Sequence, residues 1–183
     1  SAALNQGYTA ATVINDAPVV FHDTNLAQAW RPTNDGGKFY GPTRLRQALY
    51  RSQNIVSVRL LDQMGIRPTL EFLKNFGFDP NELPRNLSLS LGSANLSPLQ
   101  IASGYSVFSN GGFKVQPYLI DRVEDRYGNI IFQANPTTVC KTCTLLEKST
   151  PDEQQMGLFN TLSGFESLPV APRVLDPEIS YII

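Results

Sequence analysis

The stretch GPTRLRQALYRSQNIVSVRLL, residues 41–61, joins two helical patterns through a short polar break. The triplet Ser52-Gln53-Asn54 forms the break, and Ser52 falls where the inward-facing series requires its next apolar residue. Burying an unbonded hydroxyl or carboxamide costs about 1–3 kcal/mol, so the triplet is expected to have partners in the protein or in a ligand. The apolar residues at helical spacing are Leu45, Ala48 and Leu49 before the break and Ile55, Val58 and Leu61 after it.

A helix cap is the alternative interpretation of this triplet. Ser and Asn are common at helix boundaries, and an S-x-N sequence occurs by chance in many chains. The triplet alone therefore does not distinguish a structural role from a functional one. The surrounding sequence is needed to make that distinction.

The composition indicates a globular protein with a substantial core. The chain has 183 residues, of which 42% are hydrophobic, and its net charge is −1. This charge gives no electrostatic reason to expect nucleic acid as a partner. No run of about eighteen apolar residues occurs, so the sequence predicts no membrane span.

Hydrophobic periodicity and the positions of Gly and Pro predict the order of elements. Within residues 1–112, expected to be mostly helical, Pro68 opens one helix, and Pro98 opens another whose buried stripe is Ile101, Tyr105 and Phe108. The remaining expectations are an irregular segment at 9–40, helices at about 43–51 and 54–64, a β-hairpin at 113–133, a loop or insertion at 134–175, and the start of a helix at 176–183.

Further stretches surround the S-x-N triplet in a fixed order. They are NDAPVVF (15–21), WRPTN (30–34), LSLGSA (89–94), SPLQ (97–100), FSNGG (108–112) and PYLIDRVEDRYGN (117–129). In this order they resemble the transpeptidase domain of class A penicillin-binding proteins. The resemblance covers about residues 1–133 and resumes at Pro177.

The resemblance implies an α+β chain with the penicillin-binding/β-lactamase-like transpeptidase fold. Residues 1–183 would be part of one transpeptidase domain, a fragment covering mainly the helical half plus a β-hairpin. The parent would be a membrane-anchored enzyme on the periplasmic or extracytoplasmic face of a bacterial inner membrane. Its activity would serve peptidoglycan biosynthesis, cell shape and antibiotic resistance.

Two motifs of this enzyme class are missing from the chain. The class combines S-x-x-K, an S-D-N-type triplet and K-T-G. None of the five lysines follows a Ser by three positions, and Lys141-Thr142 is followed by Cys143 in place of the glycine that admits a substrate backbone. The resemblance implies that the nucleophile motif would end a few residues upstream of Ser1 and that the K-T-G motif would follow a helix that starts near Pro177. The chain alone is predicted to be inactive.

The resemblance also implies roles for individual residues. Ser52 would hydrogen-bond the lysines of the other two motifs and relay a proton toward the leaving amine, and Asn54 would donate from its amide to the acyl-side carbonyl of the substrate. Trp30 and Tyr40 are candidate substrate-binding residues of the cleft wall, with a core position as the alternative. The expected ligands are peptidoglycan stem peptides and β-lactams, the expected partner is the rest of the parent protein, and no cofactor is expected.

The two cysteines, Cys140 and Cys143, form a C-x-x-C pair in an irregular stretch. A zinc site of four thiolates needs a second pair, and the only histidine, His22, is far away in sequence. A redox motif would open a helix after a strand, which is not the pattern here. We expect a short disulfide, and no metal site.

Three function classes follow from these observations. The first is a segment of a serine-type D-Ala-D-Ala transpeptidase or carboxypeptidase, which contributes the S-x-N motif but not the nucleophile. The second is a non-catalytic cell-wall binding or scaffold module related to penicillin-binding proteins, motivated by the missing nucleophile. The third is a β-lactamase, a class of enzyme that uses the same set of motifs.

Overall fold

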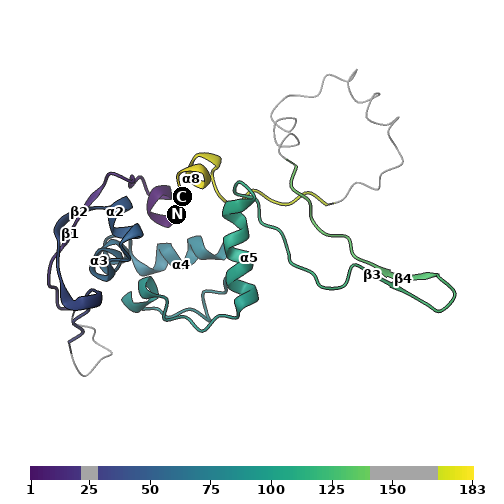
Figure 1. Cartoon of the computed structure of the whole chain (residues 1–183), viewed down its shortest axis with the longest axis horizontal. Helices are drawn as coiled ribbons and strands as arrows, with labels where there is room; N and C mark the ends of the chain where they lie inside the picture. The colour runs from purple at the N-terminus through teal and green to yellow at the C-terminus, as the bar shows by residue number, and fades with distance from the viewer. Residues whose placement is uncertain (22–28, 141–168) are drawn as a thin grey trace, which may run out of the picture. The chain divides into compact units, whose positions relative to one another are not determined.

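The computed structural model describes residues 1–21, 29–140 and 169–183 (Figure 1). The chain divides into two compact units, one made of Ser1–Ser97 with Glu178–Ile183 and the other of Pro98–Pro177. None of the helices in the described ranges has both the length and the apolar character needed to cross a bilayer.

The first unit is mainly helical. Gly65 has φ +84° and marks the boundary between two consecutive helices, as its place in the sequence predicts. The elements of this unit are α1 Ala2–Asn5, β1 Val13–Asp16, the 3-10 turn Asp35–Gly37, β2 Gly41–Arg44, α2 Leu45–Tyr50, α3 Asn54–Met64, α4 Ile66–Lys74, the 3-10 turn Leu87–Leu91 and most of α8 Pro177–Ile182.

A two-stranded antiparallel sheet precedes the helices. β1 pairs with β2, with Ile14 opposite Thr43 and Asp16 opposite Gly41. Residues 43 and 44, expected at the start of a helix, therefore belong to a strand, and the irregular segment contains the other strand. Periodicity did not reveal the pair because each strand has four residues and its partner lies far along the chain.

The core of this unit forms where the sheet meets α2 and α3. Ile14, Ala48 and Val56 are buried together, and Leu45 and Leu60 pack against them. The predicted inward stripe of α3 is confirmed, since its Ile, Val and Leu positions at 55, 58 and 61 are all at most 3% exposed. The helix is therefore fixed by packing on one side.

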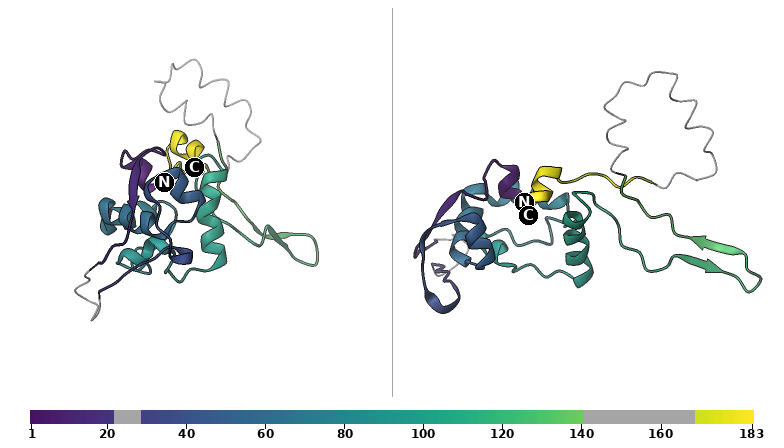
Figure 2. Two further views of the ribbon diagram at one scale, coloured as in Figure 1. Left: turned by 60° about the vertical axis from the view of Figure 1, so that its left-hand side comes forward. Right: turned by 45° about the horizontal axis from the view of Figure 1, so that its top comes forward.

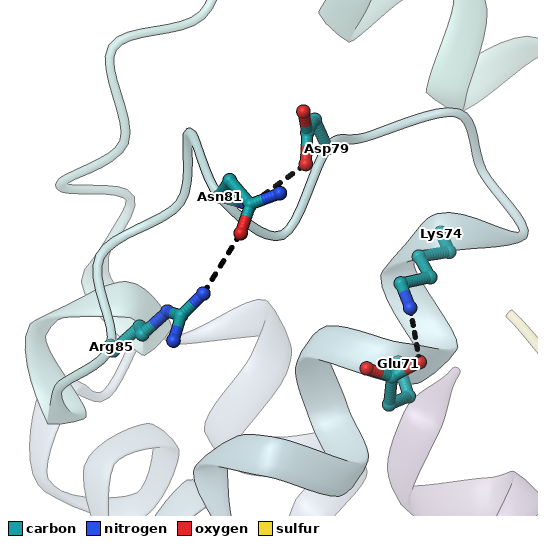
Figure 3. Close-up of polar contacts among 5 residues, drawn as sticks. All are labelled: Glu71, Lys74, Asp79, Asn81 and Arg85. Carbon is teal, nitrogen blue, oxygen red and sulfur yellow. Dashed lines mark hydrogen bonds and ion pairs between the residues drawn. The ribbon is translucent and has the colours of Figure 1, made fainter.

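The helix α4 begins at Ile66, two residues before the predicted start at Pro68. Figure 3 shows the ion pair between Lys74 and Glu71 on this helix, and the turn that follows it. In that turn the Asn81 backbone N–H donates to the Asp79 carboxylate at 2.8 Å, and Arg85 donates to the Asn81 side-chain oxygen at 2.9 Å (Figure 3).

The second unit contains α5 Pro98–Ser109, β3 Arg122–Glu124 and β4 Ile130–Gln133. The predicted buried stripe of α5 is wrong in this chain: Gly104 and Val107 are buried, whereas Ile101 and Tyr105 are 43% and 71% exposed. Both stripes are apolar or small, so periodicity alone could not choose between them.

The predicted hairpin is present but shorter than its sequence pattern. β3 pairs antiparallel with β4 in a hairpin (Figure 2). A register shift lies between Val123 and Glu124. Both strands are exposed along their length. The described ends of the predicted 134–175 loop form two single bridges, Phe113 with Arg173 and Thr138 with Val170.

Candidate functional site

Ser52 lies in a left-handed turn that closes the end of α2. Its φ is +52°, its backbone N–H donates to the Leu49 carbonyl at 3.1 Å, and the Gln53 N–H donates to the Ala48 carbonyl at 2.9 Å. These two bonds define a Schellman motif, in which Gly commonly holds the left-handed position. The turn separates α2 from α3 and presents the motif between them.

The direction of the triplet differs from the expectation. Ser52 is exposed, whereas Gln53 is 2% exposed. The left-handed residue breaks the helical period, so the side chain that continues the inward series is Gln53 and not Ser52. Neither polar atom of the Gln53 side chain has a hydrogen-bond partner among the described residues.

Asn54 is the first residue of α3 and is half-buried. Its side-chain Nδ2 donates to the Thr33 carbonyl at 2.9 Å. An amide nitrogen carries two hydrogens, so this bond leaves one for a ligand while limiting the rotation of the side chain.

A buried polar network, which sequence analysis missed, lies beneath the motif. The Asn34 Oδ1 accepts from the Ile55 backbone N–H at 3.1 Å, and its Nδ2 donates to the Asp16 carboxylate at 2.8 and 2.9 Å and to the Lys38 carbonyl at 2.9 Å. Asp16 is fully buried and also accepts from the Tyr40 N–H at 3.1 Å. Both side chains lie in the stretches that carry the family resemblance, but no periodic pattern links residues 16, 34 and 55.

The two candidate cleft residues lie in different surroundings. Tyr40 is 54% exposed, and its ring centroid lies 5.7 Å from the guanidinium carbon of Arg51. Arg51 directly precedes Ser52 in the sequence. Trp30 is half-buried and its ring lies 5.9 Å from the Phe21 ring. The structure thus brings Tyr40 toward the motif through Arg51, a residue that sequence analysis did not select.

The remaining candidates lie at or beyond the edge of the described residues. Cys140 has no free thiol, but Cys143 lies outside the described residues, so their pairing stays a prediction. His22 also lies outside them. Among the residues that the structure describes, no group of His, Cys, Asp and Glu side chains is arranged to hold a metal ion.

Known structures share this fold. A crystal structure of penicillin-binding protein 1A from Haemophilus influenzae matches 99% of the chain, and the chain covers 26% of that structure, with a TM-score of 0.80 and 35% identity. An imipenem acyl-enzyme complex of penicillin-binding protein A from M. tuberculosis matches 98% of the chain, covering 38% of that protein, with a TM-score of 0.68 and 18% identity. The fold is that of penicillin-binding proteins, and the predicted α+β class is confirmed.

Sequence comparison identifies the domain within that fold. The penicillin binding protein transpeptidase domain model matches residues 1–156. Penicillin-binding protein 1A of Pseudomonas aeruginosa is 52% identical over 139 residues, which are 76% of this chain and 17% of that protein. Its counterpart in Vibrio cholerae is 41% identical over 182 residues, 100% of this chain and 21% of that protein. The chain belongs to the penicillin-binding protein transpeptidase family, as the motifs indicated.

Proposed function

We propose that this chain is the S-x-N segment of the transpeptidase domain of a class A penicillin-binding protein, and that residues 1–183 are part of one such domain. The observation that carries the proposal is the exposed Ser52 in its left-handed turn, with Asn54 anchored beside it. The chain spans about a fifth of the curated relatives it matches. The proposal assigns the nucleophile and the K-T-G motif to the rest of the protein, because this sequence contains neither motif. The proposed location is the periplasmic or extracytoplasmic face of the inner membrane.

The proposed reaction is acyl transfer through a covalent intermediate. A serine hydroxyl from the S-x-x-K motif attacks the carbonyl between the two D-Ala residues of a stem peptide and loses its proton to the neighbouring lysine. The peptide bond breaks, and the terminal D-Ala leaves after its amine gains a proton. An amine of a second stem then displaces the serine and forms the cross-link, or water does so and yields a carboxypeptidase product.

Ser52 is suited to carry the proton in this reaction. A hydroxyl both donates and accepts, as a relay between a lysine and a leaving amine must. Its exposure on the turn leaves it open to groups from outside the chain. Asn54 has a second amide hydrogen for the acyl-side carbonyl of the substrate, and its bond to Thr33 keeps the side chain in place. Tyr40, which is 54% exposed, is the stronger of the two proposed cleft residues, and Trp30 is the other.

The test is acylation of the full-length protein that contains this chain by a labelled penicillin. We expect an adduct on the full-length protein and none on residues 1–183 alone, measured as intact mass. Ser52→Ala in the full-length protein should slow acylation by about 100-fold or more, since general acid–base groups contribute about 10²–10⁴-fold. Ser109→Ala, at an exposed hydroxyl on α5, is the matched control and should acylate normally.

Other outcomes would favour the alternatives. An adduct on the isolated chain would place a nucleophile within it and contradict the relay role of Ser52. The absence of an adduct on the full-length protein would favour a non-catalytic cell-wall binding module. Rapid release of the adduct as penicilloate would favour a β-lactamase.

A further inference from the structure

The helix α3, which begins at Asn54, has no cap from its own flanking residues. Its N-cap position is Gln53, whose side chain makes no capping hydrogen bond. The first N–H groups of a helix have no partners within the helix, and a side chain near the N-cap ordinarily satisfies one of them. Here Asn34 satisfies the Ile55 N–H at 3.1 Å from 21 positions away.

The orientation of the Asn34 amide is determined by its partners. On one side lie only acceptors, the Asp16 carboxylate oxygens at 2.8 and 2.9 Å and the Lys38 carbonyl at 2.9 Å. On the other side lies a donor, the Ile55 N–H. A rotated amide would place acceptor against acceptor and donor against donor, so Asn34 has one arrangement.

Asp16 is itself held in place by the sheet. It ends β1 opposite Gly41, accepts from the Tyr40 N–H at 3.1 Å, and has no exposed surface. Asn34 is 6% exposed. The β1–β2 pair, Asp16 and Asn34 therefore form a continuous buried connection to the first turn of α3.

The residue before Asn34 contacts the motif directly. The Thr33 carbonyl accepts from the Asn54 side chain at 2.9 Å. Residues 33 and 34 thus hold both the backbone at the start of α3 and the side chain of its first residue. A shift of this dipeptide would move Asn54.

We propose that Asn34, oriented by Asp16, is a positioning residue for acylation, because it holds the S-x-N motif in its reactive geometry. The inference rests on the proposed transpeptidase function. Asn34 acts through Asn54 and does not contact the substrate. Misplacing a substrate-holding group by about 1 Å can lower a reaction rate by up to 100-fold. A buried side chain that fixes such a group is therefore expected to have a large effect on the acylation rate.

The test is the acylation rate of the full-length protein by a fluorescent penicillin, resolved into an initial dissociation constant and an acylation rate constant. Asn34→Ala should lower the rate constant by about 10- to 100-fold. If Asn34 acts through Asn54, the double variant Asn34→Ala/Asn54→Ala should be acylated as fast as Asn54→Ala alone. All rates are measured below the melting temperature of each variant.

Two further variants complete the design. Asp16→Asn preserves shape but replaces one of the two carboxylate acceptors around the Asn34 and Tyr40 N–H groups with a donor, so it should slow acylation several-fold and remains informative if Asn34→Ala does not fold. Asn86→Ala removes another loop asparagine that bonds a helical N–H, that of Ser88 at 3.0 Å, and should acylate normally.

Normal acylation by a folded Asn34→Ala or Asp16→Asn protein would overturn the proposal. So would losses that multiply in the double variant, because they would show that Asn34 does not act through Asn54. A parent protein that forms no adduct at all would instead contradict the proposed function. The two failures are therefore distinguishable.

Discussion

At the scale of single residues, Ser52 adopts a backbone conformation that is unfavourable for it. Among the described residues it is the only one other than glycine with positive φ. The left-handed region costs a residue with a Cβ atom about 1–2 kcal/mol relative to glycine. A side chain kept in that position at this cost is expected to contribute something that glycine lacks, and here that is a hydroxyl at the proposed reaction site.

This geometry predicts opposite effects on stability and activity. Ser52→Gly should unfold with a free energy about 1 kcal/mol higher than Ser52→Ala, because glycine accepts φ +52° without strain. Both variants lack the hydroxyl, so both should lose acylation. Urea denaturation of the two proteins, beside acylation assays, measures this. Equal stability of the two variants would show that the turn does not hold residue 52 in the left-handed region.

At the scale of elements, a glycine pair joins α5 to the segment after it. Gly112 has φ +94°, and its carbonyl accepts from the Val174 and Leu175 N–H groups at 2.8 and 3.1 Å. A Cβ atom on Gly112 would lie 2.3 Å from the Leu175 carbonyl oxygen, a backbone atom that cannot rotate away. The segments at 112 and 174–175 can approach only because no side chain intervenes.

Gly112→Ala should therefore destabilise the protein by about 2–4 kcal/mol, since backbone strain and a clash combine. Gly111→Ala is the matched control. It also has positive φ, at +69°, but its Cβ would meet no atom within 4 Å, so the loss should be about 1 kcal/mol. Thermal unfolding compares the two variants. A loss no larger in Gly112→Ala than in Gly111→Ala would contradict the close approach to Leu175.

The β3–β4 turn contains the carboxylate of Asp125. The Asn129 side chain donates to it at 2.8 Å, as do the Asn129 and Tyr127 backbone N–H groups, each at 2.8 Å. The Asn129 side-chain bond, followed by the backbone bonds, lowers the pKa of Asp125 below its ordinary value. These bonds favour the charged form, so they hold the turn most strongly while Asp125 is ionised.

The sign of the pH effect follows from the lowered pKa. The contribution of Asp125 to the turn should be complete above its unfolded pKa of about 4 and be lost as the pH falls through the lower folded value. Amide chemical shifts of Tyr127 and Asn129, followed from neutral to acid pH, report this change. In Asp125→Asn the same shifts should lack that titration. A titration that persists in the variant would assign it to another group.

At the scale of the whole molecule, several large apolar side chains of the described residues are exposed. Leu119 is 94% exposed, Leu49 is 76% exposed and Ile131 is 69% exposed. The relatives are about five to six times as long as the part that this chain matches. The exposed apolar positions are consistent with our proposal that these residues belong to a larger transpeptidase domain.

Local sequence was sufficient to predict several parts of the fold and to identify the family. The apolar stripe of α3, its end at Gly65 and the helix that Pro98 opens depend on neighbours within a few residues, so their patterns are visible in the chain. The ordered stretches around Ser52 and Asn54 identified the transpeptidase family for the same reason. Short motifs preserve their spacing whether or not the fold is known.

The tertiary structure decided what depends on contacts between distant residues. It turned Ser52 outward and Gln53 inward, because a left-handed residue shifts the helical period between α2 and α3. It also paired β1 with β2 and brought Asp16 and Asn34 beneath the first turn of α3. No pattern within a few residues encodes such pairings, because they form only when the intervening chain folds back and buries their polar groups together.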